Sequence, residues 1–185
     1  MEIAAGRAIR IDRGLAVLDA LDPESAAGRL TACCASDSWV AAVVAARPFR
    51  TVDRLYAVAA AQLSALQWPD ILQALAAHPR IGSPATTEAL EARWSRAEQA
   101  GAADADATTA DALVAANVAY EEKFGFVFLI RASGRSAQDM LAAAVTRLGH
   151  DELTERSVVR GELAQIVRLR LDRLLDDLRQ EADAA

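Results

Sequence analysis

The chain has 185 residues, of which 53% are hydrophobic, and its formal net charge is −6. This length suits one domain with a sizeable buried core. The acidic balance argues against a protein that binds nucleic acids, because affinity for their phosphates depends on clustered Lys and Arg. Alanine and leucine dominate the composition, and both favour helices.

Membrane insertion and secretion are disfavoured as well. No apolar stretch reaches the roughly 18–20 residues that a membrane span requires. The first residues, MEIAAGRAIRIDRG, carry scattered charges and lack the continuous apolar region of a signal peptide. We therefore expect a cytoplasmic protein with no membrane partner. The adjacent Cys33 and Cys34 match no metal-finger spacing, so we expect two small buried hydrophobic residues.

Capping residues and prolines divide the first half of the chain into short helices. The expected helix starts are Asp22 with Pro23, Ser36 or Ser38, Thr51, and Pro69. Pro79 ends the last of these helices, because a proline keeps the residue before it out of the helical conformation. His78 is therefore expected where the helix unwinds.

The second half is also predicted to be helical, with one exception. The expected elements are a helix over 86–101, a flexible connection over 101–111, helices over 110–125 and from Ser136, and a final helix over about 152–180. Residues 126–130, FVFLI, form the only β-like run, and one run cannot make a sheet. We predict an all-α, single-domain compact helical bundle over 1–185, with its core over about 13–178 and one short extended segment near 126–131.

The two faces of the final helix differ in polarity. One face carries Leu163, Val167, Leu171, Leu174 and Leu178. The opposite face carries Arg168, Asp172, Arg173 and Asp176. We expect the first face to lie in the core and the second to face solvent.

The sequence contains no metal-binding spacing, no phosphate-binding glycine loop and no nucleophile elbow. An enzyme with this sequence is expected to work without metal or cofactor, through acid–base groups. His78 is the first candidate, because imidazole gives and takes protons near neutral pH. The alternative is a histidine that binds the carbonyls at a helix end. His150 follows a helix end too and is expected to be a surface or capping residue.

Two further stretches offer polar groups, each with a structural alternative. Ser95 and Glu98 have the spacing of a capping box, yet Ser95, Glu98 and Gln99 could also line a pocket that binds an amide or urea group. The extended segment needs partners for its backbone groups, and a polar heterocycle would be a suitable one. The alternative there is core packing of Phe124, Phe126 and Phe128. Arg131 or Arg135 could bind a carboxylate or be solvated.

Five stretches together resemble one family. CCASDSWVAAVVAARPF, LAAHPRIGS, WSRAEQAG, YEEKFGFVFLIRASGRS and IVRLRLDRLL occur in the order and approximate spacing of the OHCU decarboxylases, the 2-oxo-4-hydroxy-4-carboxy-5-ureidoimidazoline decarboxylases of urate catabolism. The resemblance covers about residues 13–178. It implies an all-helical, cofactor-independent enzyme that converts OHCU to (S)-allantoin and CO2, and it suggests a homodimer.

The resemblance also implies a set of site residues. His78 matches the family's catalytic histidine, and Glu98 would assist it. The implied substrate-binding residues are Pro79, Ser95, Arg96, Ala97, Glu98, Gln99, Phe128, Leu129, Ile130, Arg131 and Ala132. Two positions depart from the family pattern, Val127 where proline is common and Arg131 where a small residue is common. A carboxylate-binding role for the Arg131 side chain is therefore not implied.

The chemistry of the implied reaction suggests roles for three of these residues. His78 would manage the 4-hydroxyl proton or deliver a proton to C5, Glu98 would position or polarise His78 and the ring, and Gln99 would contact the amide-like edge. An apolar wall around the substrate carboxylate would favour the release of neutral CO2. The alternative function is a helical binding or regulatory domain for a purine-derived ligand that is not turned over.

Overall fold

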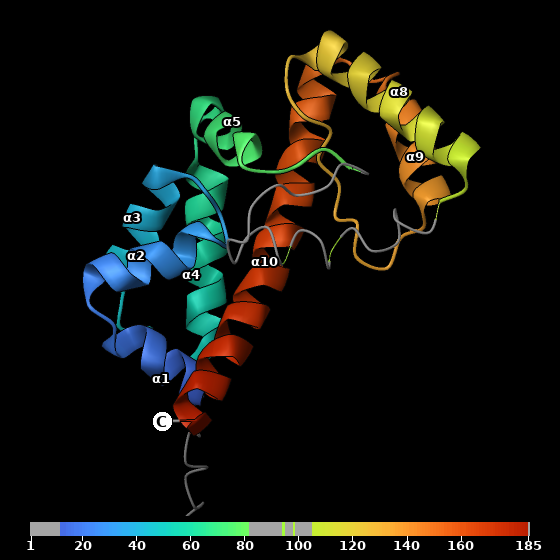
Figure 1. Ribbon diagram of the computed structural model, residues 1–185. Coiled ribbons are helices and arrows are strands. Elements are labelled where there is room, and N and C mark those ends of the chain that lie inside the picture. Colours follow the sequence, from blue (N-terminus) through green and yellow to red (C-terminus); the bar gives the residue numbers. More distant parts are fainter. Residues whose placement is uncertain (1–11, 82–93, 95–97, 99–104, 185) are drawn as a thin grey trace, which may run out of the picture.

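The computed structural model describes residues 12–81, 94, 98 and 105–184. All regular secondary structure in these residues is helical (Figure 1). The helices are α1 (Arg13–Ala20), α2 (Pro23–Thr31), α3 (Asp37–Ala45), α4 (Val52–Ala65), α5 (Trp68–Ala76), α8 (Ala107–Phe124), α9 (Ala137–Arg147) and α10 (Glu152–Ala184). The predicted all-α class is confirmed.

Side-chain caps begin most of these helices, as the sequence predicted. Asp22 caps α2 with Pro23 at its first position, and Thr51 caps α4. Of the two serines considered for α3, Ser36 is the cap. Ser136 caps α9 in a reciprocal capping box with Asp139. Each cap satisfies an N–H group that the helix itself leaves without an acceptor.

The predicted flexible connection over 101–111 is wrong from Ala107 onward, because α8 begins there. The Asp106 side chain accepts the Thr109 N–H at 3.0 Å and starts this helix. The Ala- and Asp-rich composition concealed a good N-cap followed by helix-forming alanines. The predicted helix over 86–101 lies outside the described residues except for Trp94 and Glu98, which are helical and buried.

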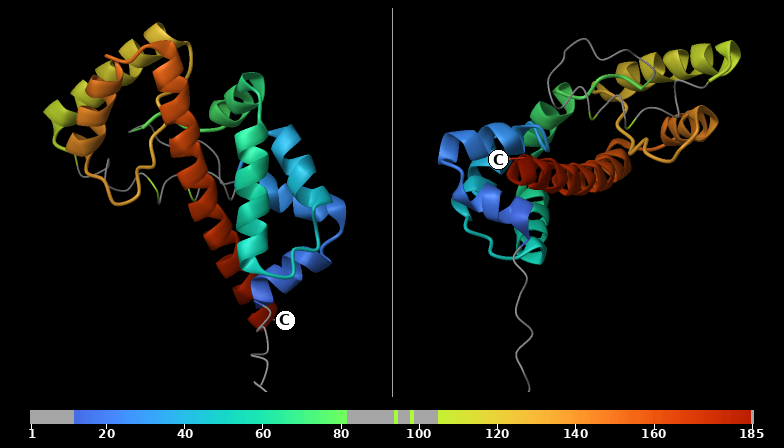
Figure 2. Two further views of the ribbon diagram at one scale, coloured as in Figure 1. Left: turned by 180° about the vertical axis from the view of Figure 1, so that it is seen from behind. Right: turned by 60° about the horizontal axis from the view of Figure 1, so that its bottom comes forward.

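The long helix α10 connects the two ends of the molecule. Helices α1 to α4 lie along its C-terminal half, and the α8–α9 hairpin lies at its N-terminal end (Figures 1 and 2). The predicted apolar face of α10 is buried throughout. None of the described helices is long and apolar enough to cross a membrane.

The opposite face of α10 is only partly in solvent. Arg168 and Asp176 are exposed, and Asp172 accepts the Tyr56 hydroxyl. Arg173 is half-buried and binds the buried Glu98, so the prediction that it faces solvent is wrong. The reason is a long-range contact, because Arg173 Nη1 donates to the Trp94 carbonyl at 3.3 Å and to the Glu98 carboxylate at 2.8 Å.

The extended segment runs from Phe126 to Ala132 and belongs to no strand. Gly125, with a φ of 77°, ends α8 and turns the chain into it. Two helices bind its backbone. Arg147 on α9 donates to the Leu129 carbonyl at 2.8 Å, and the Arg131 N–H donates to Glu162 on α10 at 2.7 Å. The segment is thus buried among helices, as predicted.

Candidate active site

His78 lies just after the end of α5, in the position that the sequence predicted. Its backbone N–H donates to the Leu75 carbonyl at 2.9 Å, and its Nδ1 lies 2.9 Å from the Ala74 carbonyl. Because a carbonyl only accepts hydrogen bonds, Nδ1 carries the proton. Nε2 is therefore the unprotonated nitrogen, and it is buried with no hydrogen-bond partner among the described residues.

The surroundings of His78 favour the neutral ring. Burial and the positive charge of Arg170 lower the pKa of His78 from 6.5 to about 4, against a smaller opposing effect of the Ala74 hydrogen bond. At neutral pH the imidazole is thus neutral, with one lone pair available on Nε2. Such a group acts first as a base and becomes an acid only after it has accepted a proton.

Glu98 is held by two arginines of α10. Its carboxylate accepts from Arg170 Nη2 at 3.0 Å and Nε at 3.2 Å, and from Arg173 Nη1 at 2.8 Å. The side chain of Arg170 is 1% exposed and that of Glu98 is 9% exposed. Both arginines thus hold one buried carboxylate in place through charge-assisted hydrogen bonds.

A small cavity joins these groups. It has a volume of about 20 Å³ and is lined by His78, Pro79, Ile81, Glu98, Phe128, Leu129, Ile130, Ala132, Ile166 and Arg170. This volume holds about one water molecule. The walls must therefore move apart before a ligand with many heavy atoms can enter.

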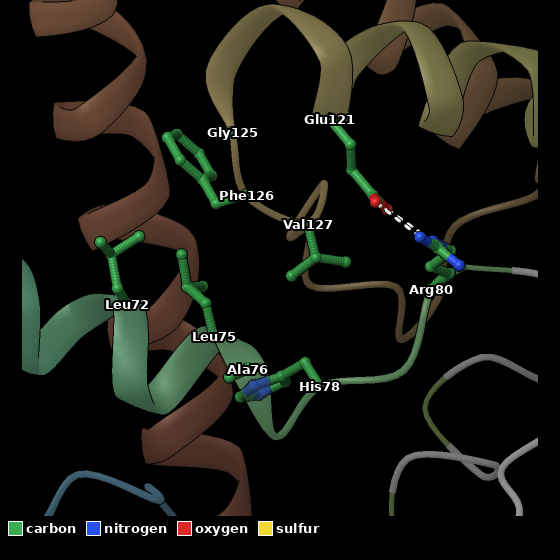
Figure 3. Close-up of a pocket in the computed structure, with 9 residues that line it drawn as sticks. All are labelled: Leu72, Leu75, Ala76, His78, Arg80, Glu121, Gly125, Phe126 and Val127. Atoms are coloured by element: carbon green, nitrogen blue, oxygen red, sulfur yellow. Dashed lines mark hydrogen bonds and ion pairs between the residues drawn. The ribbon is translucent and has the colours of Figure 1, made fainter.

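A larger hollow lies on another side of His78. Its volume is about 450 Å³, within the range of small-molecule pockets (Figure 3). It is lined by Leu72, Leu75, Ala76, His78, Arg80, Glu121, Gly125, Phe126 and Val127. Most of this lining is apolar, and an ion pair between Arg80 and Glu121 lies at one side. His78 is the residue that the two hollows share.

The structure places most of the predicted site residues around the small cavity. Those that line it are His78, Pro79, Glu98, Phe128, Leu129, Ile130 and Ala132. Arg131 does not line it, and its backbone N–H is bound to Glu162. Arg135 lies 3.7 Å from the same carboxylate. The predicted residues Ser95, Arg96, Ala97 and Gln99 lie outside the described residues, as does the proposed capping box.

Sequence reasoning missed Arg170 and Arg173. Arg170 lies three residues after Val167 and four before Leu174, which places it on the apolar face of α10. A charged residue on a buried helix face needs a partner, so this spacing was a usable signal. Arg173 gave no such signal, because its partner Glu98 lies 75 residues away.

His150 was expected to be a surface or capping residue, and its side chain is 26% exposed, but the sequence did not reveal its partner. Its Nδ1 lies 2.8 Å from Oε2 of Glu155, whose side chain is fully buried. His150 therefore belongs to a second polar cluster between α8, α9 and α10.

Comparison with known proteins shows the family to which the chain belongs. The family model described as OHCU decarboxylase matches residues 19–172. The chain belongs to the OHCU decarboxylase family. A crystal structure of OHCU decarboxylase in the presence of (S)-allantoin is 28% identical, with a TM-score of 0.71, and the match covers 80% of this chain and 98% of that one. A crystal structure of (S)-allantoin synthase is 18% identical with a TM-score of 0.64, which supports the fold alone.

Curated relatives of this OHCU decarboxylase family member come from three organisms. The uric acid degradation bifunctional protein TTL of Arabidopsis thaliana is 32% identical over 149 residues, 78% of this chain and 46% of that protein. The 2-oxo-4-hydroxy-4-carboxy-5-ureidoimidazoline decarboxylase of Haloferax volcanii is 32% identical over 135 residues, 72% of this chain and 79% of that protein. The match to the bifunctional protein PucL of Bacillus subtilis covers 31% of that protein. The chain thus spans less than half the length of the two bifunctional relatives.

Proposed function

We propose that this chain catalyses the decarboxylation of OHCU to (S)-allantoin and CO2, without a cofactor. The observation that carries the proposal is one cavity whose wall contains the neutral His78, the Glu98–Arg170 ion pair and the extended segment. Family membership and the likeness to a structure determined in the presence of (S)-allantoin support the same reaction.

The charge of the site suits the substrate. The guanidinium group of Arg170 lies in the cavity wall, and a guanidinium group suits a carboxylate ligand. Phe128, Leu129 and Ile130 supply an apolar wall beside it. Beside this apolar wall a carboxylate is less stable than in water, which favours its departure as neutral CO2.

His78 acts as the acid–base residue. When the bond between C4 and the carboxylate breaks, its electron pair forms a C4=C5 bond, and the C5=N electrons move to nitrogen, which takes a proton from solvent. His78 Nε2 then accepts the 4-hydroxyl proton and returns it to C5 on one face, which leaves a carbonyl at C4. The lone pair on Nε2 and the bound Nδ1 fit this role.

Glu98 is a positioning group in this scheme. Its carboxylate is bound by Arg170 and Arg173, so it orients the Arg170 guanidinium at the cavity wall. Pro79 and residues 128–130 with Ala132 would contact the substrate, and Ser95, Arg96, Ala97, Gln99 and Arg131 stay candidate contacts from the sequence. A homodimer and a cytoplasmic location also stay predictions.

The proposed reaction can be followed by circular dichroism of freshly generated OHCU. We expect the wild-type chain to accelerate the appearance of the (S)-allantoin signal. The variant His78→Gln should lose roughly 10²–10⁴-fold of that acceleration, the usual contribution of a general acid–base group. Binding of OHCU without acceleration would contradict the proposal and indicate the regulatory ligand-binding domain instead. Equal rates for wild type and His78→Gln would contradict the role of His78.

A further inference from the structure

One face of α8 binds the loop that carries His78. Asn117 and Glu121 lie one helical turn apart on α8. Asn117 Nδ2 donates to the Ile81 carbonyl at 3.0 Å. The Glu121 carboxylate accepts from Arg80 Nε at 2.6 Å and from Arg80 Nη2 at 2.7 Å (Figure 3). Two consecutive loop residues are thus attached to two consecutive turns of one helix.

The other end of the same loop is attached to α5. There the His78 N–H and Nδ1 bind the carbonyls of Leu75 and Ala74. His78 and Pro79 therefore lie between a fixed point on α5 and a fixed point on α8. Few free torsions separate Arg80 from His78, because each residue has only two soft dihedrals and the φ of Pro79 is fixed by its ring, so a shift of Arg80 or Ile81 is readily passed on to His78.

We propose that Glu121 and Asn117 are positioning residues that hold the loop from His78 to Ile81 against α8 and so fix the direction of His78 Nε2 in the cavity. This inference rests on the proposed function and deepens it. Neither residue lines the small cavity, so each acts on that cavity through the loop, although Glu121 also lines the larger hollow beside His78. Misplacement of a catalytic group by about 1 Å is enough to lower a rate up to 10²-fold.

The Arg80–Glu121 ion pair is partly exposed, so a positioning role can be distinguished by experiment from a contribution to global stability. The side chains of Arg80 and Glu121 are 59% and 25% exposed. Ion pairs with this exposure contribute little to the free energy of unfolding. The bidentate geometry nevertheless fixes the direction of the Arg80 side chain relative to α8. A loss of activity without a loss of stability is therefore the signature of the proposed role.

The test compares Glu121→Ala with Glu181→Ala. Glu181 on α10 binds Arg29 on α2 at 2.9 Å, also as an exposed pair between distant segments, and neither residue lines either hollow. For Glu121→Ala we expect kcat for OHCU to fall roughly tenfold, with KM and Tm close to those of Glu181→Ala. Asn117→Ala should lower kcat in the same direction, because it releases Ile81.

Rescue by exchange of the charges completes the test. The double variant Arg80→Glu with Glu121→Arg restores the ion pair and should recover most of the lost kcat. Wild-type kcat in Glu121→Ala and Asn117→Ala, an equal loss in Glu181→Ala, or no recovery in the exchanged variant would overturn the inference. If one of these results is obtained while His78→Gln is inactive, the proposed function stands and only the positioning role of Glu121 and Asn117 is refuted. If the wild-type chain itself does not accelerate the reaction, the proposed function fails, and the inference fails with it.

Discussion

The two histidines of the chain each lie near a buried glutamate that binds arginine. His78 shares a cavity with Glu98, which is bound by Arg170 and Arg173. His150 binds Glu155, which is bound by Arg147. The two clusters thus contain the same three residue types, and they differ in how their hydrogen-bonding groups are used.

The Glu155 cluster is satisfied by its own members. Oε1 accepts from Arg147 Nε at 2.8 Å and from the Tyr120 hydroxyl, and Oε2 lies 2.8 Å from His150 Nδ1. Burial, with the Glu155 hydrogen bond, raises the pKa of Tyr120, so its hydroxyl keeps its proton. Arg147 also lies over the Phe128 ring, at 4.6 Å from its centroid. This cluster joins α8, α9 and α10.

The His78 cluster leaves hydrogen-bonding capacity for a ligand. Nε2 of His78 has no partner in the part of the chain that the structure describes, and the cavity lies against the Glu98–Arg170 pair. A buried polar atom without a partner costs free energy, and a role in binding or catalysis is one explanation for such an atom. Residue types alone therefore do not distinguish a catalytic cluster from a structural one. The His78 cluster differs in that it lines a cavity and offers that cavity a hydrogen-bond acceptor without a partner.

The largest effect on the free energy of unfolding is expected for Glu155→Ala, and its effect on kcat should differ from that of the matching change at Glu98. In Glu155→Ala the buried Arg147 loses its carboxylate, and we expect the free energy of unfolding to fall by about 3–5 kcal/mol. The folded fraction should lose less kcat than Glu98→Ala, because Glu155 does not line the cavity and acts on it only through Arg147 and the Leu129 carbonyl. Urea unfolding followed by far-UV circular dichroism measures the first quantity and assays below the transition measure the second.

The matched variant for that experiment is Glu98→Ala. It should lower both stability and kcat, because it releases Arg170 at the cavity wall. The distinction between the clusters fails if Glu155→Ala loses as much kcat as Glu98→Ala at equal folded fraction.

A smaller effect concerns the dependence of stability on pH. The folded pKa of His78 is about 4 and its ordinary value is 6.5, so between these values the unfolded chain binds more protons than the folded chain. Above pH 6.5 the ring is neutral in both states and does not lower the free energy of unfolding. As the pH falls from 6.5 towards 4, the unfolded chain gains a proton that the folded chain does not, and the free energy of unfolding decreases. The slope for one proton is at most about 1.4 kcal/mol per pH unit.

His78→Gln removes that proton site and serves as its own comparison. We expect urea midpoints of the wild-type chain to fall more steeply than those of His78→Gln between pH 6.5 and 4. Parallel curves would mean that His78 titrates normally and is not held neutral.

Most of the fold could be predicted from interactions between residues that are close in the sequence. The caps at Asp22, Ser36, Thr51 and Ser136 depend on residues three positions away, so a single sequence contains the whole interaction. The start of α8 was missed although its cap, Asp106, is local, because the surrounding alanines and aspartates resemble a linker. The extended segment was found from its aromatic and β-branched residues.

Long-range contacts limited the prediction of the site. His78 and Glu98 were candidates from their residue types and spacing, and the family resemblance suggested their roles, whereas the arginines that hold Glu98 were not predicted. Arg170 and Arg173 are separated from Glu98 by 72 and 75 residues, and no local pattern brings them together. The same holds for His150, whose partner Glu155 belongs to a cluster that three helices assemble.

The most direct test of the account observes the two histidine rings during ligand binding. With isotope-labelled histidine, the NMR spectrum contains two imidazole rings, which His150→Gln assigns. The account predicts that (S)-allantoin shifts the Nε2 resonance of His78 in a saturable manner and leaves the His150 ring unchanged. A saturable shift of His150 alone, or no shift of His78 at saturating (S)-allantoin, would contradict it.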